Sequence, residues 1–179
     1  MKFYVCSFGG SGSWMLAQHL SRYGEVRHVH SRSPPARLCT AENEHFTTRL
    51  LSPHAAKVLF VYRDPIVAMC SVERRHSMAA HCRNIECAPT TLEAVAAANV
   101  DLFGLAEFFM NYTTGVRNYP IVCIKYETLA SHLSSLHALL GLPLDSKLTI
   151  KETACTPPTI PCYADLQEKM RAMPPIYVA

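Results

Sequence analysis

The sequence predicts an α/β fold in which a central, mostly parallel sheet lies between two layers of helices. Three short runs, at residues 2–8, 57–63 and 120–126, are almost continuously apolar, which is typical of strands buried on both faces of a parallel sheet. Helical patterns alternate with these runs, as the crossover connections of a parallel sheet require. A chain of 179 residues with 49% hydrophobic residues suits one domain, spanning 1–179, better than two.

The individual elements follow from local patterns in chain order. The strand at 2–8 leads into a turn, and a weaker strand-like run follows at 25–31. Helical patterns occupy residues 13–23, 65–80, 91–116 and 129–142. Proline-rich pieces at 33–38 and 155–163 predict loops. From about residue 155 we expect a short helix followed by a loose tail.

Composition narrows the class of partner. A formal charge of +3 and a pI near 8.4 suit an anionic small molecule and fall short of a nucleic-acid-binding stripe. No apolar run reaches the roughly 18 residues of a membrane span, and Met1 leads directly into strand-like sequence, so we expect a cytoplasmic protein without membrane contact. The eight cysteines are expected to be reduced and mostly buried.

A turn rich in glycine and serine follows the first predicted strand. Gly9, Gly10 and Gly12 permit close backbone approach, while Ser11 and Ser13 can cap the next helix and donate to phosphate oxygens. A helix N-terminus at the carboxyl end of a strand favours an anion. The stricter phosphate-loop and dinucleotide patterns are absent, because no lysine follows Gly12 and GxGxxG does not occur. A helix capped by serine, with no ligand, is the alternative interpretation.

A second signal lies in VLFVYRDPIVAMCS. Arg63 stands at the carboxyl end of a buried strand, Pro65 suits the first turn of a helix, and Ser71 follows about two turns later. A guanidinium at this sheet edge can bond two phosphate oxygens with its planar fork. A structural pair between Arg63 and Asp64, or a salt bridge across the loop, is the alternative.

Three segments together resemble the sulfotransferases that use 3'-phosphoadenosine 5'-phosphosulfate (PAPS). SFGGSGSWML is similar to that family's 5'-phosphosulfate loop, and RDPIVAMCS to its 3'-phosphate motif, with arginine and serine eight positions apart. CIKYETL followed by LHALLGLP resembles its tyrosine and acidic pair and the helix after it. The resemblance covers roughly residues 3–143 and implies a P-loop NTPase-like sulfotransferase fold.

The resemblance also implies a reaction and a donor site. The chain would transfer a sulfuryl group from PAPS, without a metal, to a hydroxyl or amine of a small-molecule or glycan acceptor, leaving adenosine 3',5'-bisphosphate (PAP). Ser11, Gly12 and Ser13 would hold the phosphosulfate end, Arg63 and Ser71 the 3'-phosphate, and Tyr126 would lie near the adenine. The implied donor-site residues are Gly9, Gly10, Ser11, Gly12, Ser13, Trp14, Arg63, Ser71 and Tyr126.

The sequence departs from the family at three points. The family's loop lysine aligns with Gly10, so another cation, Arg32 or Arg37, would have to stabilise the charge that develops on the leaving group. Trp14 stands one position before the family's tryptophan. The family's late basic cluster has no clear match. Lys169 and Arg171 are its nearest candidates, and the exposed face of a terminal helix is the simpler interpretation.

Transfer to a hydroxyl also requires a base. His28 and His30 are two apart and fall on one face of a strand, and His30 is nearer the carboxyl end, so we predict His30 as base with Arg32 as charge stabiliser. Other candidate bases are Glu42, Glu44 and His45. The spacing of His76, His81, Cys82 and Cys87 fits no zinc template, and we expect no metal.

Two other functions compete with sulfuryl transfer. A PAP- or PAPS-binding module of the same fold with weakened catalysis would explain the missing lysine. A P-loop kinase is disfavoured, because both the lysine and its following hydroxyl are wrong.

Overall fold

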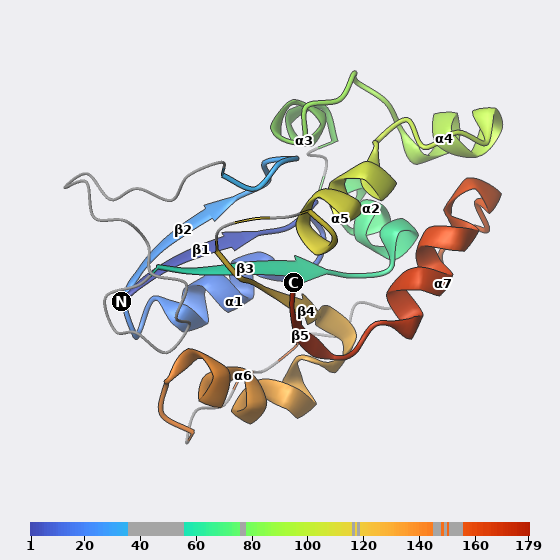
Figure 1. Cartoon of the computed structure of the whole chain (residues 1–179). Coiled ribbons are helices and arrows are strands. Elements are labelled where there is room, and N and C mark those ends of the chain that lie inside the picture. The colour runs from blue at the N-terminus through green and yellow to red at the C-terminus, as the bar shows by residue number, and fades with distance from the viewer. Residues whose placement is uncertain are drawn as a thin grey trace.

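The computed structural model describes residues 1–35, 56–75, 78–115, 117, 119–144, 148, 150 and 156–179. The predicted α/β class with a mostly parallel sheet is confirmed: five strands are arranged in the order β2-β1-β3-β4-β5 (Figure 1). The strands are β1 (Lys2–Cys6), β2 (Glu25–Val29), β3 (Ala56–Tyr62), β4 (Ile121–Lys125) and β5 (Ile176–Val178). The first four are parallel, and β5 runs antiparallel to β4.

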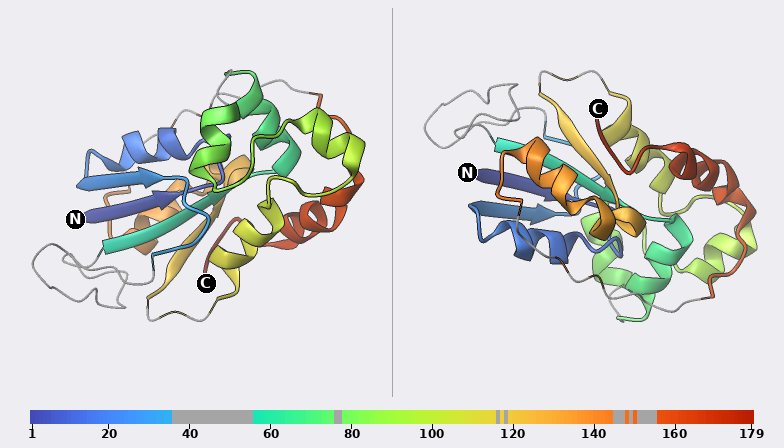
Figure 2. Two further views of the ribbon diagram at one scale, coloured as in Figure 1. Left: turned by 90° about the horizontal axis from the view of Figure 1, so that it is seen from above. Right: turned by 90° about the horizontal axis from the view of Figure 1, so that it is seen from below.

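Helices cover both faces of the sheet, which gives three layers (Figure 2). One face packs against α1 (Ser13–Leu20) and α6 (Leu133–Leu140). The core on the other face takes apolar side chains from a larger group of helices: α2 (Pro65–Glu73), α3 (Met78–Asn84), α4 (Leu92–Ala98), α5 (Leu105–Thr113) and α7 (Ala164–Ala172). Three short 3-10 helices complete the described structure: η1 (Tyr126–Thr128), η2 (Ala130–His132) and η3 (Pro161–Tyr163).

Strand β3 shows why the apolar runs are continuous. Val58, Phe60 and Tyr62 face the core that contains α2 and α5, while Leu59 and Val61 face the core that contains α1 and α6. All five side chains are buried. Because successive side chains of a strand point to opposite faces, a strand covered on both sides needs apolar residues at every position.

Two expected helices are interrupted. The pattern at 91–116 divides into α4 and α5, because Asn99 and Gly104 adopt the left-handed conformation, with φ of 49° and 66°. The Asp101 carboxylate then accepts hydrogen bonds from two amides at the start of α5. The pattern at 65–80 likewise divides into α2 and α3, so the single helices expected over 65–80 and 91–116 are wrong.

The short helix expected after residue 155 is α7, but the loose tail expected after it is wrong, because β5 follows α7. Helix α7 buries Leu166 and Met170, and Tyr163 just before it is fully buried and donates its hydroxyl to Asp101 at 2.7 Å. Strand β5 then pairs with β4. This packing buries the apolar side chains of α7 and gives the edge strand β4 a hydrogen-bonding partner. The prolines before α7 predict a loop but carry no signal for these later contacts.

The strand order determines where a ligand would bind. Strands β2 and β3 lie on opposite sides of β1, so the connections from β1 to β2 and from β2 to β3 run in opposite directions across the sheet. In doubly wound sheets of this order, the crevice at the carboxyl ends of the strands opens at that reversal. The connection from β1 to α1 and the start of α2 after β3 both lie at this edge (Figure 1).

Two further features concern the chain as a whole. The thiols of Cys6, Cys70, Cys82 and Cys123 are buried, and those of Cys87 and Cys162 are partly exposed. Within the described residues, no helix combines the length and the apolar character that a membrane crossing needs.

Candidate functional site

The connection from β1 to α1 is a left-handed glycine turn. Gly9, Gly10 and Gly12 have φ of 87°, 64° and 68°, and Gly12 is the N-cap residue of α1. Within the described part of the chain, the amides of Gly10, Ser11 and Gly12 have no hydrogen-bond partner. The first amides of α1 have no partner within the helix either. Unpaired amides at a helix N-terminus form an arrangement that favours an anion.

The serine hydroxyls of this turn are engaged within the protein. Ser11 is buried and donates to the Gly9 carbonyl at 3.0 Å, while Ser13 lies 2.7 Å from the Ser7 hydroxyl and 2.8 Å from Nε2 of His28. Neither serine caps α1, because the N-cap residue is a glycine and no side chain accepts from the helix. The expectation that Ser11 and Ser13 cap the helix is therefore wrong.

The hydrogen bonds of His30 determine its tautomer. Its Nδ1 lies 2.8 Å from the Ser7 carbonyl oxygen, which only accepts, so Nδ1 carries the hydrogen and Nε2 of the neutral ring is a proton acceptor. Burial lowers the pKa of His30, and the charge of Arg75 adds to this effect. His30 is therefore neutral at pH 7 and has the protonation state that a base requires.

The same reasoning orients the hydroxyls beneath the turn. Ser7 accepts from the Gly9 amide at 3.1 Å and cannot donate to the protonated Nδ1 of His30. Its hydroxyl therefore donates to Ser13, and Ser13 donates to Nε2 of His28. This directed chain fixes the ring of His28 and the start of α1 relative to each other.

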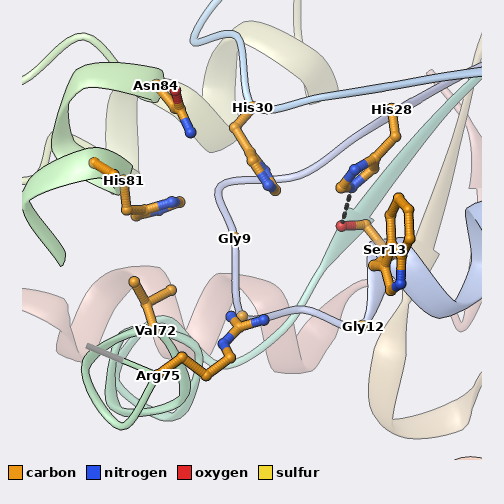
Figure 3. Close-up of a pocket in the computed structure, with 12 residues that line it drawn as sticks. Gly9, Gly12, Ser13, His28, His30, Val72, Arg75, His81 and Asn84 are labelled. Atoms are coloured by element: carbon orange, nitrogen blue, oxygen red, sulfur yellow. Dashed lines mark hydrogen bonds between the residues drawn. The ribbon is translucent and has the colours of Figure 1, made fainter. Parts of the chain in front are cut away.

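The turn forms one wall of a cavity of about 270 Å³. Figure 3 shows His28 and His30 entering it from the end of β2, Arg75 from the residues just after α2, and His81 and Asn84 from α3. The predicted glycine loop and the predicted base are thus brought to one cavity.

Trp14 stands at the rim of this cavity. Its side chain is 61% exposed, and its ring meets that of His28 edge-on at a centroid distance of 5.7 Å. An exposed indole at a cavity rim can pack against a flat ligand group without first losing contacts of its own.

The structure engages Arg32 away from the predicted base. Its guanidinium donates to the carbonyls of Ile85, Phe103 and Gly104 at 2.8 to 3.0 Å and pairs with Glu107 at 3.3 Å. These bonds join the turn after α3 to the start of α5. Arg32 does not line the cavity, so the structure does not bring its guanidinium to the cavity wall that His30 forms.

Arg63 and Tyr126 lie together at the carboxyl ends of β3 and β4. The Arg63 guanidinium lies 4.8 Å from the centre of the Tyr126 ring, and its Nε is 3.9 Å from Glu127. A Cβ on Gly12 would lie 2.0 Å from the Tyr126 ring, so this stack adjoins the glycine turn. Asp64 caps α2 by accepting from two of its amides. The ion pair of Arg63 is thus with Glu127 and not with Asp64, whose carboxylate accepts from the helix amides.

Other predicted residues are spread more widely. Arg63, Ser71 and Tyr126 do not line the 270 Å³ cavity, although the Ser71 carbonyl accepts from Nε of Arg75 at 3.0 Å. Arg171, a candidate for the late basic cluster, lines a second cavity of about 290 Å³ that also includes Glu127. The ammonium of Lys169 lies 2.8 Å from the sulfur of Met110.

Several predictions fall outside the described residues: Arg37, Glu42, Glu44, His45 and His76. Over the described ranges, no three or more His, Cys, Asp or Glu side chains form a group that could hold a metal ion.

Sequence reasoning missed Arg75 and Asn84 as cavity residues. Arg75 lies four positions after Ser71, and this helical spacing would have placed the two residues on one face of a helix. Asn84 carried no comparable signal, because its position depends on the packing of α3 across the sheet edge.

We expect the fold to lose stability in acid through the cavity histidines. Burial lowers the pKa of His28 and of His81 to about 4, against an ordinary value of 6.5. The unfolded chain therefore takes up protons that the folded chain resists, so the free energy of unfolding should fall as pH drops from about 6.5 to about 4. Urea unfolding across this range should show a shallower fall for His81→Gln. An unchanged slope for His81→Gln would contradict the assignment.

Comparisons of the chain with protein-family models, with curated proteins and with solved structures found no match.

Proposed function

We propose that this chain is a PAPS-dependent sulfotransferase with a P-loop NTPase-like sulfotransferase fold. It transfers the sulfuryl group to a hydroxyl or amine of a small-molecule or glycan acceptor and releases PAP. The observation that carries the proposal is the cavity at the ends of β1 and β2. It is lined by a neutral histidine and by a glycine turn whose amides have no hydrogen-bond partner among the described residues. This pairing of an anion site with a base suits transfer of an anionic group to a hydroxyl.

The chemistry assigns a task to each part of the cavity. Nε2 of His30 accepts the proton of the acceptor hydroxyl while the acceptor oxygen forms its bond to sulfur. The bond between sulfur and the bridging oxygen breaks, and the amides of Gly10, Ser11 and Gly12 together with the N-terminus of α1 stabilise the charge left on the 5'-phosphate. The cavity takes the phosphosulfate end of the donor together with the acceptor hydroxyl. Holding the two reacting groups side by side lowers the entropic cost of bringing them together.

Arg63 supports the assignment of the nucleotide end. Its Nε is buried and makes no hydrogen bond within the described residues, and its ion pair with Glu127 is long, at 3.9 Å. A long pair with a half-exposed carboxylate contributes little, so a phosphate can replace Glu127 at small cost. The ring of Tyr126 beneath the guanidinium holds it in place.

A nucleotide-binding module without turnover is the second candidate. The observation that favours it is the glycine turn itself, which has no lysine, together with the engagement of Arg32 elsewhere. Such a module would bind PAP and PAPS but would not release PAP from PAPS when hydroxyl acceptors are added. Product formation therefore distinguishes the two candidates once donor binding has been measured.

Donor binding is tested by calorimetry with PAP, ADP and ATP. We expect the wild type to prefer PAP by about tenfold or more, because the 3'-phosphate adds a charge-assisted contact that ADP lacks. Arg63→Ala should remove this preference. The matched Arg22→Ala changes an exposed arginine just after α1, at the opposite edge of the sheet, and should leave it unchanged. No binding, or a preference for ATP, would overturn the proposal.

A further inference from the structure

The glycine turn cannot carry its own cation. Gly10 has φ of 64°, and a Cβ at this position would lie 2.0 Å from the carbonyl oxygen of Ala68 in α2. A side chain here would have to displace helix backbone in a conformation that L residues rarely adopt. Any positive charge at the anion site must therefore come from another element.

Of the arginines that the sequence suggested for the anion, Arg32 and Arg63 do not supply it, and Arg37 lies outside the described residues. Arg32 is bound to three backbone carbonyls and Glu107, and Arg63 lies over Tyr126 beside Glu127. Neither lines the cavity. Neither Arg32 nor Arg63 therefore brings a positive charge to the amides of the glycine turn.

Arg75 has the position that these arginines lack. It lines the cavity, and Figure 3 shows its guanidinium turned toward the glycine turn, across the cavity from His30. Its Nε donates to the Ser71 carbonyl, which fixes the stem of the side chain. Within the described residues its two terminal amino groups make no hydrogen bond and no ion pair. The fork of the guanidinium is therefore free to receive oxygen atoms from a ligand.

We infer that Arg75 binds the outer tetrahedral oxyanion of the donor, which is the sulfuryl group under the proposed function. The inference rests on that function for the identity of the group. A guanidinium fork matches two oxygens of a tetrahedral oxyanion, and unlike an ammonium it binds them in a fixed orientation. Arg75 thus takes the place of a loop lysine from the opposite wall of the cavity.

The histidines around Arg75 are neutral and therefore add no positive charge to the cavity. His28, His30 and His81 all face this cavity, and burial lowers the pKa of each. The charge of Arg75 further lowers the pKa of His30 and His81. Among the described residues that line the cavity, an oxyanion at pH 7 would therefore meet the positive charge of Arg75 and three neutral imidazoles.

The test compares Arg75→Ala and Arg75→Lys with a matched control, Arg74→Ala. Arg74 is the C-cap residue of α2 and does not line the cavity. Calorimetry with inorganic pyrophosphate, PAPS and PAP reports on anion binding. We expect Arg75→Ala to weaken pyrophosphate and PAPS binding at least tenfold and PAP binding no more than threefold, because PAP lacks the outer group. Arg75→Lys should fall between wild type and Arg75→Ala, and Arg74→Ala should stay within twofold of wild type.

A ligand-free readout accompanies this comparison. NMR titration should show the pKa of His30 rising in Arg75→Ala, because a nearby positive charge is removed, and unchanged in Arg74→Ala. If wild type prefers PAP to ADP but Arg75→Ala behaves like Arg74→Ala, the inference fails and the proposed function stands. If pyrophosphate binding depends on Arg75 but PAP is not preferred, the inference stands and the proposed function fails. Wild type that binds neither pyrophosphate nor PAPS overturns both.

Discussion

Gly10→Lys is expected to destabilise the protein by about 3 kcal/mol or more, although it restores the lysine that the resemblance to sulfotransferases implies. The left-handed backbone costs a non-glycine residue about 1 to 2 kcal/mol, and overpacking costs roughly 1 to 3 kcal/mol more. Here the contact is a Cβ placed 2.0 Å from the carbonyl oxygen of Ala68, which belongs to helix backbone and cannot rotate away. Urea unfolding measures the effect.

Gly115→Ala is the matched control for this substitution. Gly115 does not have a positive φ, and its Cβ would approach only the end of the Arg117 side chain, which can move. Its free energy of unfolding should stay within about 0.5 kcal/mol of wild type. A Gly10→Lys protein with wild-type stability and stronger binding of pyrophosphate would show that the turn is not packed against α2.

Arg32→Ala is expected to cost about 3 kcal/mol of stability and to affect anion binding only through the loss of folded protein. Its charged hydrogen bonds hold the carbonyls of Ile85, Phe103 and Gly104, and the side chain is 12% exposed. Hydrogen bonds to a charged group contribute about 1.5 to 3 kcal/mol, and carbonyls left without a partner add a desolvation cost. Urea unfolding gives the stability, and pyrophosphate calorimetry on the folded fraction gives the binding.

The control for Arg32→Ala removes its exposed partner. The Glu107 side chain is 67% exposed, and such an ion pair contributes about 1 kcal/mol or less, so Glu107→Ala should change stability little. Folded Arg32→Ala that keeps wild-type stability but loses pyrophosphate binding would restore the catalytic role predicted from the sequence.

The fold could be predicted from sequence where a pattern had a single physical cause. The apolar runs at β1, β3 and β4 identified buried strands, because a strand covered on both faces needs apolar residues throughout. The division between α4 and α5 could not be predicted, because it depends on Asn99, a residue other than glycine that adopts a positive φ. Strand β5 has only three residues, too few to show a period.

The site was predictable where topology determined it. Parallel strands end at one edge, so the glycine turn and His30 were expected near each other, and both line the cavity. Arg32 stands two positions after His30, but its side chain points to α5. The direction of a side chain in a loop cannot be predicted from its distance in sequence to a site residue. Arg75 was missed for the opposite reason, since its place in the cavity depends on where α2 lies after folding.

The glycine turn contains three glycines because it is crowded. Gly9 packs against the ring of His81 and Gly12 against the ring of Tyr126, while Gly10 packs against the backbone of α2. Contacts from α3, η1 and α2 therefore hold the turn in one conformation in the absence of ligand. A preorganised turn loses little conformational entropy on binding, so more of its interaction energy contributes to affinity. We expect the amides of this turn to show backbone order parameters of about 0.85, which is typical of a rigid backbone, even in the free protein, unlike those of a flexible glycine linker.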